Sequence, residues 1–250
     1  QNFNQQSSYI AIKGRSMGTM YGYIYDGTYK YDDFNKSGNS YTLKANVPHF
    51  SGENNTQPGM PKYRDINGDG VVDSNDCTVI GNGLPIHTGG FTNNFAYAGF
   101  DLSIFFQWSY GNDILNANRL FFESSWNTAR DLNQFASYAN RWTEENPTSN
   151  IPRAINSASN KVFSSRIIED GSFLRLKTVT LGYTLPKQIT SKVHIDNLRV
   201  YFAAQNLFTI TSYSGYDPEV SIRDNALTPG LDFSAYPRAR QFSFGLHIGF

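Results

Sequence analysis

The sequence has little of what would define a disulfide-rich secreted domain or a nucleic-acid-binding protein. Its 250 residues include one cysteine, Cys77, which excludes an intrachain disulfide. Only 17% of the residues are charged, against roughly 25% in an average soluble domain. The 21 basic and 21 acidic residues cancel, so nucleic acid is not expected as a partner.

Membrane-helix and catalytic signals are missing as well. No apolar run approaches the roughly 18 residues that a transmembrane helix needs, so a helical membrane protein is not predicted. We expect no signal peptide at the polar start of the chain. The four histidines are scattered, and no nucleophile motif or phosphate-binding glycine loop is present. We therefore predict that the protein is not an enzyme.

Aromatic residues and period-two patterns are what the sequence does have. Phe, Tyr and Trp make up 15% of the chain, which favours strands and interfaces. In 100–110 apolar side chains occupy every even position, and only Phe105 breaks the alternation. The segments 198–210 and 242–250 alternate in the same way. Each is about as long as a tilted membrane-spanning strand of roughly 9–11 residues.

Four weaker strands bring the expected total to about seven. These are 7–13, 18–26, 88–97 and 173–185. The last has a phase slip between Leu176 and Val179, which predicts a β-bulge. Alternation alone would also fit a soluble β-sandwich, which turns one apolar face inward.

The lengths of the connections favour a membrane barrel. If the last strand ends in the periplasm, three long connections are extracellular: 27–87, 111–172 and 211–240. Three short ones are then periplasmic: 14–17, 98–99 and 186–197. Bacterial barrels have long extracellular loops and short periplasmic turns. The sequence therefore predicts an all-β fold, part of an antiparallel transmembrane β-barrel.

One long connection, 111–172, is expected to contain a short helix. Thr128 and Asp131 resemble a capping box, and Pro147 would end the helix. The apolar residues with helical spacing are Leu132, Phe135, Ala136, Ala139 and Trp142. Trp126 and Trp142 are candidates for stacking on a sugar ring of a substrate, although packing within the loop is the favoured alternative.

The sharpest local motif is an Asp-rich run over 65–76. Its oxygen-bearing residues have the spacing of a calcium loop, with Gly70 at the sixth position. The predicted ligands are Asp65, Asn67, Asp69, the backbone carbonyl of Val71, Asp73 and Asp76. Position twelve is Asp76 rather than the usual Glu, which predicts weaker calcium binding. The alternative is an ion-free turn, in which four carboxylates would repel one another.

Several short segments, in order along nearly the whole chain, resemble one known family. They are GTMYGY (18–23), YDG (25–27), PKYRDINGDG (61–70), TGGF (88–91), GFDLS (99–103), YGND (110–113), FLRLK (173–177), LGY (181–183), QNLFT (205–209), GYDPE (215–219) and the pair Pro237-Arg238. This collinear set resembles the SusC/RagA-type TonB-linked outer-membrane proteins.

The resemblance implies a function and partners. Such proteins lie in the lipid of the bacterial outer membrane and import oligosaccharides or peptides. A TonB system drives them, and a SusD-like surface lipoprotein caps them. Their plug and TonB-contacting segments are N-terminal and match nothing in 1–250. We therefore expect 1–250 to be the C-terminal portion of the barrel domain, with TonB acting through the part that is missing.

The end of the chain also resembles a functional signal. Gly245, Ile248 and Phe250 lie in a final strand similar to the signal read by the barrel-insertion machinery. The alternative function is a secreted all-β calcium-binding module that binds surface carbohydrate. It would explain the strands and the calcium loop, but not the sorted connections or the terminal Phe250. Dependence of solubility on detergent would separate the two.

Overall fold

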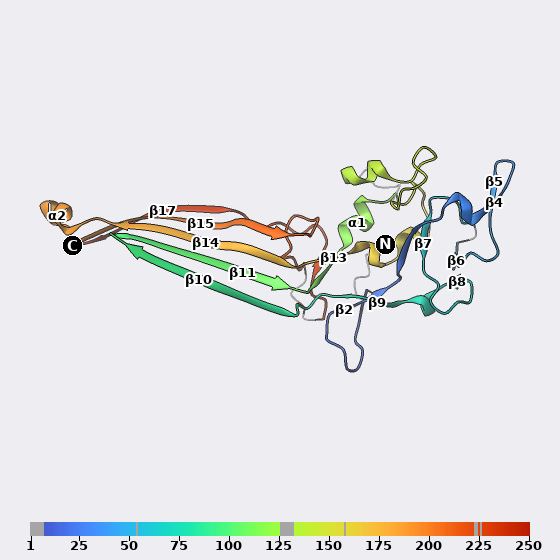
Figure 1. The fold of residues 1–250 in the computed structure, drawn as a ribbon, viewed down its shortest axis with the longest axis horizontal. Helices are drawn as coiled ribbons and strands as arrows, with labels where there is room; N and C mark the ends of the chain where they lie inside the picture. The colour runs from blue at the N-terminus through green and yellow to red at the C-terminus, as the bar shows by residue number, and fades with distance from the viewer. Residues whose placement is uncertain (1–7, 54, 126–132, 158, 223–224, 226) are drawn as a thin grey trace. The chain divides into compact units, whose positions relative to one another are not determined.

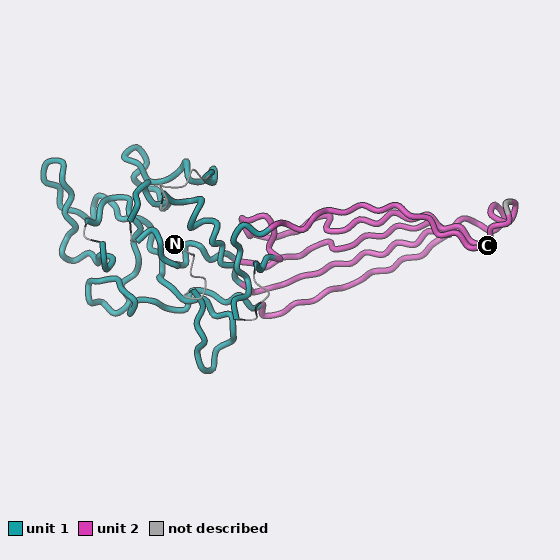
Figure 2. The backbone as a smooth tube through the Cα atoms, turned by 180° about the vertical axis from the view of Figure 1, so that it is seen from behind, with its two compact units in different colours: residues 1–84, 113–169, 220–235 teal, residues 85–112, 170–219, 236–250 magenta. Residues whose placement is uncertain are grey.

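The chain divides into two compact units. The computed structural model describes residues 8–53, 55–125, 133–157, 159–222, 225 and 227–250. Unit 1 comprises residues 1–84, 113–169 and 220–235, and unit 2 comprises 85–112, 170–219 and 236–250 (Figure 2). Among the described residues, no helix is long and apolar enough to cross a bilayer.

Unit 2 is built on one five-stranded antiparallel sheet of long strands. Its order is β10-β11-β14-β15-β17 (Figure 1). The strands are β10 (His87–Tyr97), β11 (Phe100–Tyr110), β14 (Phe173–Thr184), β15 (Asn197–Thr211) and β17 (Gln241–Gly249). The connection from β14 to β15 holds α2 (Lys187–Thr190) and the 3₁₀ helix η7 (Ser191–Val193). Five of the predicted strands are thereby confirmed, within a residue or two of their expected bounds.

The turn between β10 and β11 has only two residues. Ala98 and Gly99 both adopt positive φ, 48° and 85°. This conformation matches the twist of the flanking strands, and glycine adopts it without strain. A Cβ at Gly99 would also lie 2.8 Å from the carbonyl oxygen of Thr184, so the position needs glycine for space as well.

The predicted bulge in β14 is present. Leu176 pairs with Phe106 and Phe208, whereas Thr178 pairs with Phe105 and Gln205. Lys177 is therefore passed over in both ladders. A bulge of this kind re-aims the following side chains and explains the phase slip of the sequence.

Within the five-stranded sheet the connections are sorted by length, as predicted, whereas 27–87 does not join two strands of this sheet. Tyr97 pairs with Phe100, Thr184 with Arg199 and Asn197 with Gly249, so the short connections lie at one end of the sheet. The long connections 111–172 and 212–240 leave from the opposite end. In outer-membrane barrels the long connections are the extracellular ones.

The two faces of the sheet differ in polarity. The register aligns Phe95, Leu102, Leu181, Phe202 and Phe244 in one row across all five strands. This apolar face is exposed: Phe242, Phe244 and Leu246 keep 57%, 83% and 67% of their surface accessible. The opposite face carries polar pairs. One example is Arg199, whose Nε donates to Oδ1 of Asp101 at 2.9 Å. An apolar face without cover is what the predicted lipid-facing surface requires.

Unit 1 consists of small sheets and irregular chain. Its sheets are β1-β2-β9, β13-β12-β16, β3-β7, β4-β5 and β6-β8. Its strands are β1 (Tyr9–Ile10), β2 (Thr19–Gly22), β3 (Tyr25–Thr28), β4 (Phe34–Ser37), β5 (Ser40–Leu43), β6 (His49–Phe50), β7 (Pro61–Tyr63), β8 (Val71–Val72), β9 (Thr78–Asn82), β12 (Asp113–Asn116), β13 (Ile168–Asp170) and β16 (Leu231–Asp232). Its helices are α1 (Ala117–Phe122) and the 3₁₀ helices η2 (Tyr31–Asp33), η3 (Ser74–Asp76), η4 (Ala136–Asn140), η5 (Ser159–Lys161) and η6 (Ser165–Ile167).

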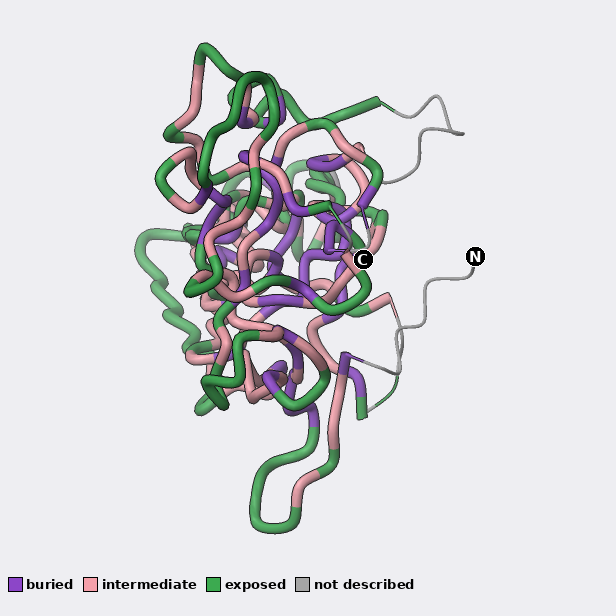
Figure 3. Tube along the Cα trace, turned by 90° about the vertical axis from the view of Figure 1, so that its right-hand side faces the viewer, coloured by how far each residue is buried: buried purple, intermediate pink, exposed green. Residues whose placement is uncertain are grey.

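Deep burial is concentrated in unit 1. Among the described residues, all large apolar side chains below 2% exposure belong to it (buried positions are purple in Figure 3): Met20, Tyr29, Met60, Val72, Ile114, Leu115, Ile167 and Leu231. Apart from Ile114, these side chains belong to three separate clusters rather than to one continuous core. Unit 1 is therefore held together by local packing around each small sheet.

Two predicted strands do not join the long sheet. The described residues of 7–13 and 18–26 form β1, β2 and the start of β3, which are short strands of unit 1. Gly22 lies so close to the carbonyl oxygen of Phe163 that a Cβ would meet it at 2.5 Å. Close tertiary contact, not a membrane face, thus explains this aromatic and glycine-rich pattern, and 14–17 is not a turn of the long sheet.

The predicted helix around 128–142 is wrong over its described part, although α1 gives the connection 111–172 a short helix. Phe135 is extended, and only the 3₁₀ turn η4 follows it. The backbone N–H of Phe135 donates to the carbonyl of Phe122 and that of Trp142 to the carbonyl of Ile151, both within the connection 111–172 but outside helical spacing. These hydrogen bonds replace the bonds of an α-helix. Thr128, Asp131 and Leu132 lie outside the described residues.

Candidate functional site

The Asp-rich loop 65–76 folds around its first and last carboxyl groups. Asp65 accepts hydrogen bonds from the backbone N–H groups of Gly68 and Gly70, at 2.7 and 2.8 Å. The buried Asp76 accepts from Ile66 at 2.7 Å and from Asp73 at 2.8 Å. Gly68 and Gly70 both have positive φ, which permits the sharp turns.

Backbone hydrogen bonds favour the charged form of Asp76, at the end of this loop. Burial raises the pKa of Asp76, but hydrogen bonds donated by the backbone N–H groups of Asp73, Ile66 and Asn67 outweigh it, so this pKa lies below its ordinary value. Elsewhere the carboxylates serve the loop itself: Oδ1 of Asp69 accepts from Val71 at 2.9 Å. Within the described part of the chain, no three acidic, histidine or cysteine side chains converge as a metal cluster would. The calcium site therefore stays a prediction.

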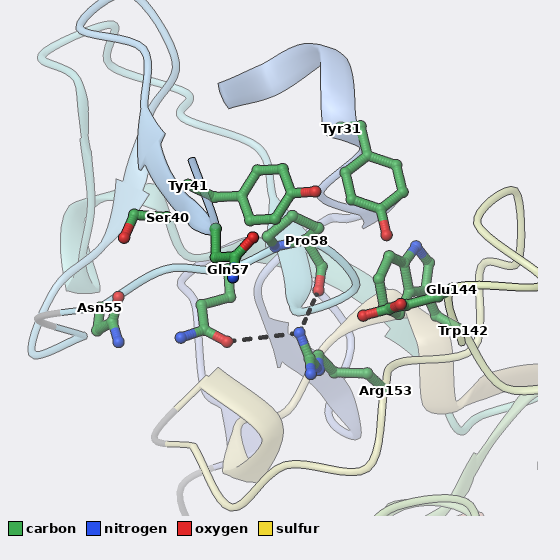
Figure 4. Close-up of a pocket in the computed structure, with 10 residues that line it drawn as sticks. Tyr31, Ser40, Tyr41, Asn55, Gln57, Pro58, Trp142, Glu144 and Arg153 are labelled. Carbon is green, nitrogen blue, oxygen red and sulfur yellow. Dashed lines mark hydrogen bonds between the residues drawn. The ribbon is translucent and has the colours of Figure 1, made fainter. Parts of the chain in front are cut away.

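A second candidate site is a pocket of about 330 Å³ in unit 1. Three separate stretches of chain line it: the hairpin β4–β5 with η2, residues 55–58, and residues 142–153. Figure 4 shows the rings of Tyr31 and Tyr41 on one side and the side chains of Gln57 and Arg153 opposite them. The tyrosine ring centroids are 5.3 Å apart. Polar and aromatic groups thus converge on a small space, as they do in ligand sites.

Trp142 forms part of the pocket wall, but its ring is already packed. A Cβ on Gly59 would lie 2.3 Å from the indole, so the Gly59 backbone touches the ring directly. The Arg153 guanidinium lies 5.3 Å from the ring centroid. Trp142 is 4% exposed, and its Nε1 has no hydrogen-bond partner among the described residues. The arrangement agrees with packing within the loop; Trp126, the other candidate, lies outside the described residues.

The sequence did not point to the rest of this pocket. Asn39 and Tyr41 lie in one hairpin, Gln57 follows in a separate segment and Arg153 is 96 residues further on, so these residues share no spacing motif. The Pro58-Gly59 pair is the one local signal: the φ of Gly59 is +83°, and its missing side chain makes room for Trp142.

The predicted assembly signal lies on β17. Phe250 is 89% exposed, just beyond the end of the strand. Gly245 pairs with Tyr201, and a Cβ there would lie 2.3 Å from the tyrosine ring. Gly245 is therefore needed for packing, whatever its part in assembly. Ile248 pairs with Leu198 on the apolar face.

The sheet of unit 2 defines a class of protein. One face is apolar and exposed, the other is polar, and the connections are sorted by length. Its outermost strands, β10 and β17, each have one partner within the described sheet. Because an unpaired edge is costly in lipid, such a sheet is part of the wall of a larger closed barrel.

Comparison with known proteins gives the family. No family model matches the chain. It is 34% identical over 254 residues to TonB-dependent receptor P3 of Formosa agariphila, covering 100% of this chain and 24% of the relative. It is 27% identical to TonB-dependent receptor SusC of Bacteroides thetaiotaomicron, covering 79% of the chain and 18% of SusC. The chain belongs to the SusC/RagA-type TonB-dependent outer-membrane receptors, and it spans about a quarter of the length of P3.

A solved structure agrees with the fold. The RagAB peptide importer in its closed-closed state superposes with a TM-score of 0.68 at 23% identity, covering 97% of this chain and 25% of the other. The chain therefore corresponds to part of an outer-membrane β-barrel. The alternative of a secreted calcium-binding module is not supported, because the relatives are outer-membrane receptors.

Proposed function

We propose that the protein to which this chain belongs imports nutrients through the outer membrane, driven by TonB. The observation that carries the proposal is the barrel-wall sheet of unit 2. The similarity of the whole chain to TonB-dependent receptor P3 adds to it. The substrates would be oligosaccharides or peptides. SusC is named as a TonB-dependent receptor, and RagAB as a peptide importer. No catalytic role is included in the proposal.

A SusD-like surface lipoprotein would be the working partner of the importer. The support is the similarity of the chain to SusC and to the RagAB importer, whose name denotes two components. The long connections of unit 2 all leave from the end that is extracellular in such barrels, so they are the parts available to a surface partner. Co-purification of the full-length protein from detergent-solubilised outer membranes would test this. Recovery of the receptor alone under mild conditions would count against it.

An uptake assay tests the importer proposal itself. Cells making the full-length protein are given fluorescent oligosaccharides or fluorescent peptides, with and without TonB. We expect accumulation of one of the two sets, abolished when TonB is absent or the proton gradient is collapsed. Accumulation that persists without TonB, or none of either set, would contradict the proposal.

Calcium would have a structural role in unit 1. The support is the ligand spacing of 65–76 and the turn that Asp65 and Asp76 form by accepting backbone hydrogen bonds. The six predicted ligand residues would hold one ion, which would offset the repulsion of four carboxylates. An EF-hand helix is not expected before the loop, because Pro58 and Pro61 lie in the preceding segment and proline disrupts the interior of a helix. The site would therefore order the connection rather than act as a switch.

The final strand would be read during assembly. Strand addition at an open edge is a general mode of recognition, and β17 is an edge strand within the described sheet. Its apolar face and the exposed Phe250 are the features that the insertion machinery would contact. Gly245 and Ile248 belong to the same proposed signal.

A further inference from the structure

We propose that the pocket between the β4–β5 hairpin and residues 142–153 binds a neutral sugar unit. The inference deepens the proposed function, and it rests on that function for its biological role only. The volume of about 330 Å³ is near the lower end of ligand pockets, roughly 300–1,000 Å³. It suits a single ring of a longer molecule, with the rest of that molecule extending into solvent.

The floor of the pocket is preorganised. The backbone N–H of Arg153 donates to the carbonyl of Gly59 at 2.8 Å, and that of Trp142 to Ile151 at 2.8 Å. The Arg153 guanidinium reaches the carbonyl of Pro58 at 3.0 Å and Oε1 of Gln57 at 3.4 Å. These bonds join two distant segments before any ligand arrives, so little ordering is left to oppose binding.

The polar groups match a ligand rich in hydroxyls. The amides of Asn39, Asn55 and Gln57 each offer both a donor and an acceptor. Each hydroxyl of a sugar also donates and accepts, so such side chains can satisfy it in either direction. The Glu144 carboxylate adds acceptors, and the Arg153 guanidinium adds donors.

The charges and aromatic rings of the pocket further restrict the chemical class of its ligand. Glu144 and Arg153 cancel formally, which disfavours a ligand of strong single charge. The tilted rings of Tyr31 and Tyr41 offer apolar surface for the C–H groups of a pyranose. Trp142 cannot provide this surface, since Gly59 and Arg153 cover its ring. Its role is to support Tyr31, at 5.6 Å between centroids.

The test uses the full-length protein purified in detergent. It is applied to printed arrays of neutral oligosaccharides and of short peptides, and any binder is titrated by calorimetry. The variants are Tyr31→Ala, Tyr41→Ala and Glu144→Gln. Tyr236→Ala is the matched control, because Tyr236 is 91% exposed and does not line the pocket. Heat-dependent gel mobility confirms that each variant is a folded barrel.

We expect binding to neutral oligosaccharides, weakened by roughly tenfold or more in each pocket variant and unchanged in the control. Binding to peptides alone, no binding at all, or sugar binding that survives all three substitutions would overturn the inference. The uptake assay separates the two proposals. If uptake depends on TonB but the pocket variants bind sugar normally, only the pocket proposal is contradicted. If the protein binds sugar in the pocket but uptake does not depend on TonB, only the importer proposal is contradicted.

Discussion

Arg175 and Asp217 form a buried ion pair that fastens a long connection to the barrel sheet. Nη2 of Arg175, on β14, bonds Oδ1 of Asp217, and their side chains are only 3% and 6% exposed. Asp217 also accepts from the backbone N–H groups of Glu219 at 2.9 Å and Arg238 at 3.0 Å. Both ends of the segment 217–238 are thereby held at one carboxylate, which makes Asp217 an anchor for the connection.

The first prediction is that Asp217→Asn releases this connection. Removing one partner of a buried pair typically costs about 3–5 kcal/mol. The cost should be smaller here, because Oε2 of Glu219 lies 3.1 Å from Nη1 of Arg175 and still compensates part of its charge. Hydrogen exchange of the full-length protein in detergent should show faster exchange over 212–240, with little change in β10 and β11. The control is Asp32→Asn, at an exposed aspartate. Unchanged protection of 212–240 would show that the pair is not an anchor.

The second prediction concerns acid. Burial raises the pKa of Asp217, but the hydrogen bond from Arg175 and those from the backbone of Arg238 and Glu219 outweigh it, so the folded pKa lies below the ordinary value. A depressed folded pKa contributes stability above the unfolded pKa of about 3.9, and this stability is lost as the pH falls through the folded value. Protection of 212–240 should therefore be constant near neutral pH and fall only in strong acid.

The Asp217→Asn variant is the control for that titration. In this variant the protection of 212–240 should not fall in strong acid, because the amide of Asn does not titrate. If wild type loses protection between pH 5 and pH 7 instead, another group controls the connection.

The third prediction is that calcium orders the loop 65–76. Chelation should increase hydrogen exchange and protease cleavage in this loop, and added Ca²⁺ should reverse both, because the ion would offset carboxylate repulsion. Asp69→Asn should weaken the calcium response while leaving the fold intact, since the amide oxygen can still accept from Val71. Asp32→Asn again serves as control. A loop equally protected with and without calcium would remove the site.

The elements that could be predicted from sequence are those specified locally. β11 and β17 have a period of two because one face meets lipid, and the slip at Lys177 marks a real bulge. The prediction of a barrel strand at 18–26 was wrong because Gly22 and its neighbours pack closely within unit 1. The pocket could not be foreseen, since Tyr41, Gln57 and Arg153 come together only in the tertiary fold, where Arg153 donates to Gln57.

The fourth prediction is that loss of Phe250 lowers the outer-membrane level of the full-length protein without lowering its synthesis. Phe250 is 89% exposed, so its removal should cost the fold little. Membrane fractionation with quantitative blotting would measure the level. Tyr236→Ala is the control, because it removes another exposed ring upstream of β17. Unchanged membrane levels would contradict a role in assembly.

The fifth prediction compares two adjacent residues of β17 on opposite faces. Phe244 is 83% exposed and lies in the apolar row with Phe202, whereas Ser243 pairs with Ala203 on the polar face. Phe244→Lys would place a charge in lipid, at a cost of roughly 2–4 kcal/mol if the position is near the midplane. Ser243→Lys places the same charge toward the lumen, where water or polar groups can solvate it. Phe244→Lys should therefore lower the free energy of unfolding more than Ser243→Lys does. Denaturant titration in lipid vesicles would measure both values. Equal costs at the two positions would mean that the apolar face of this sheet is not the lipid-facing one.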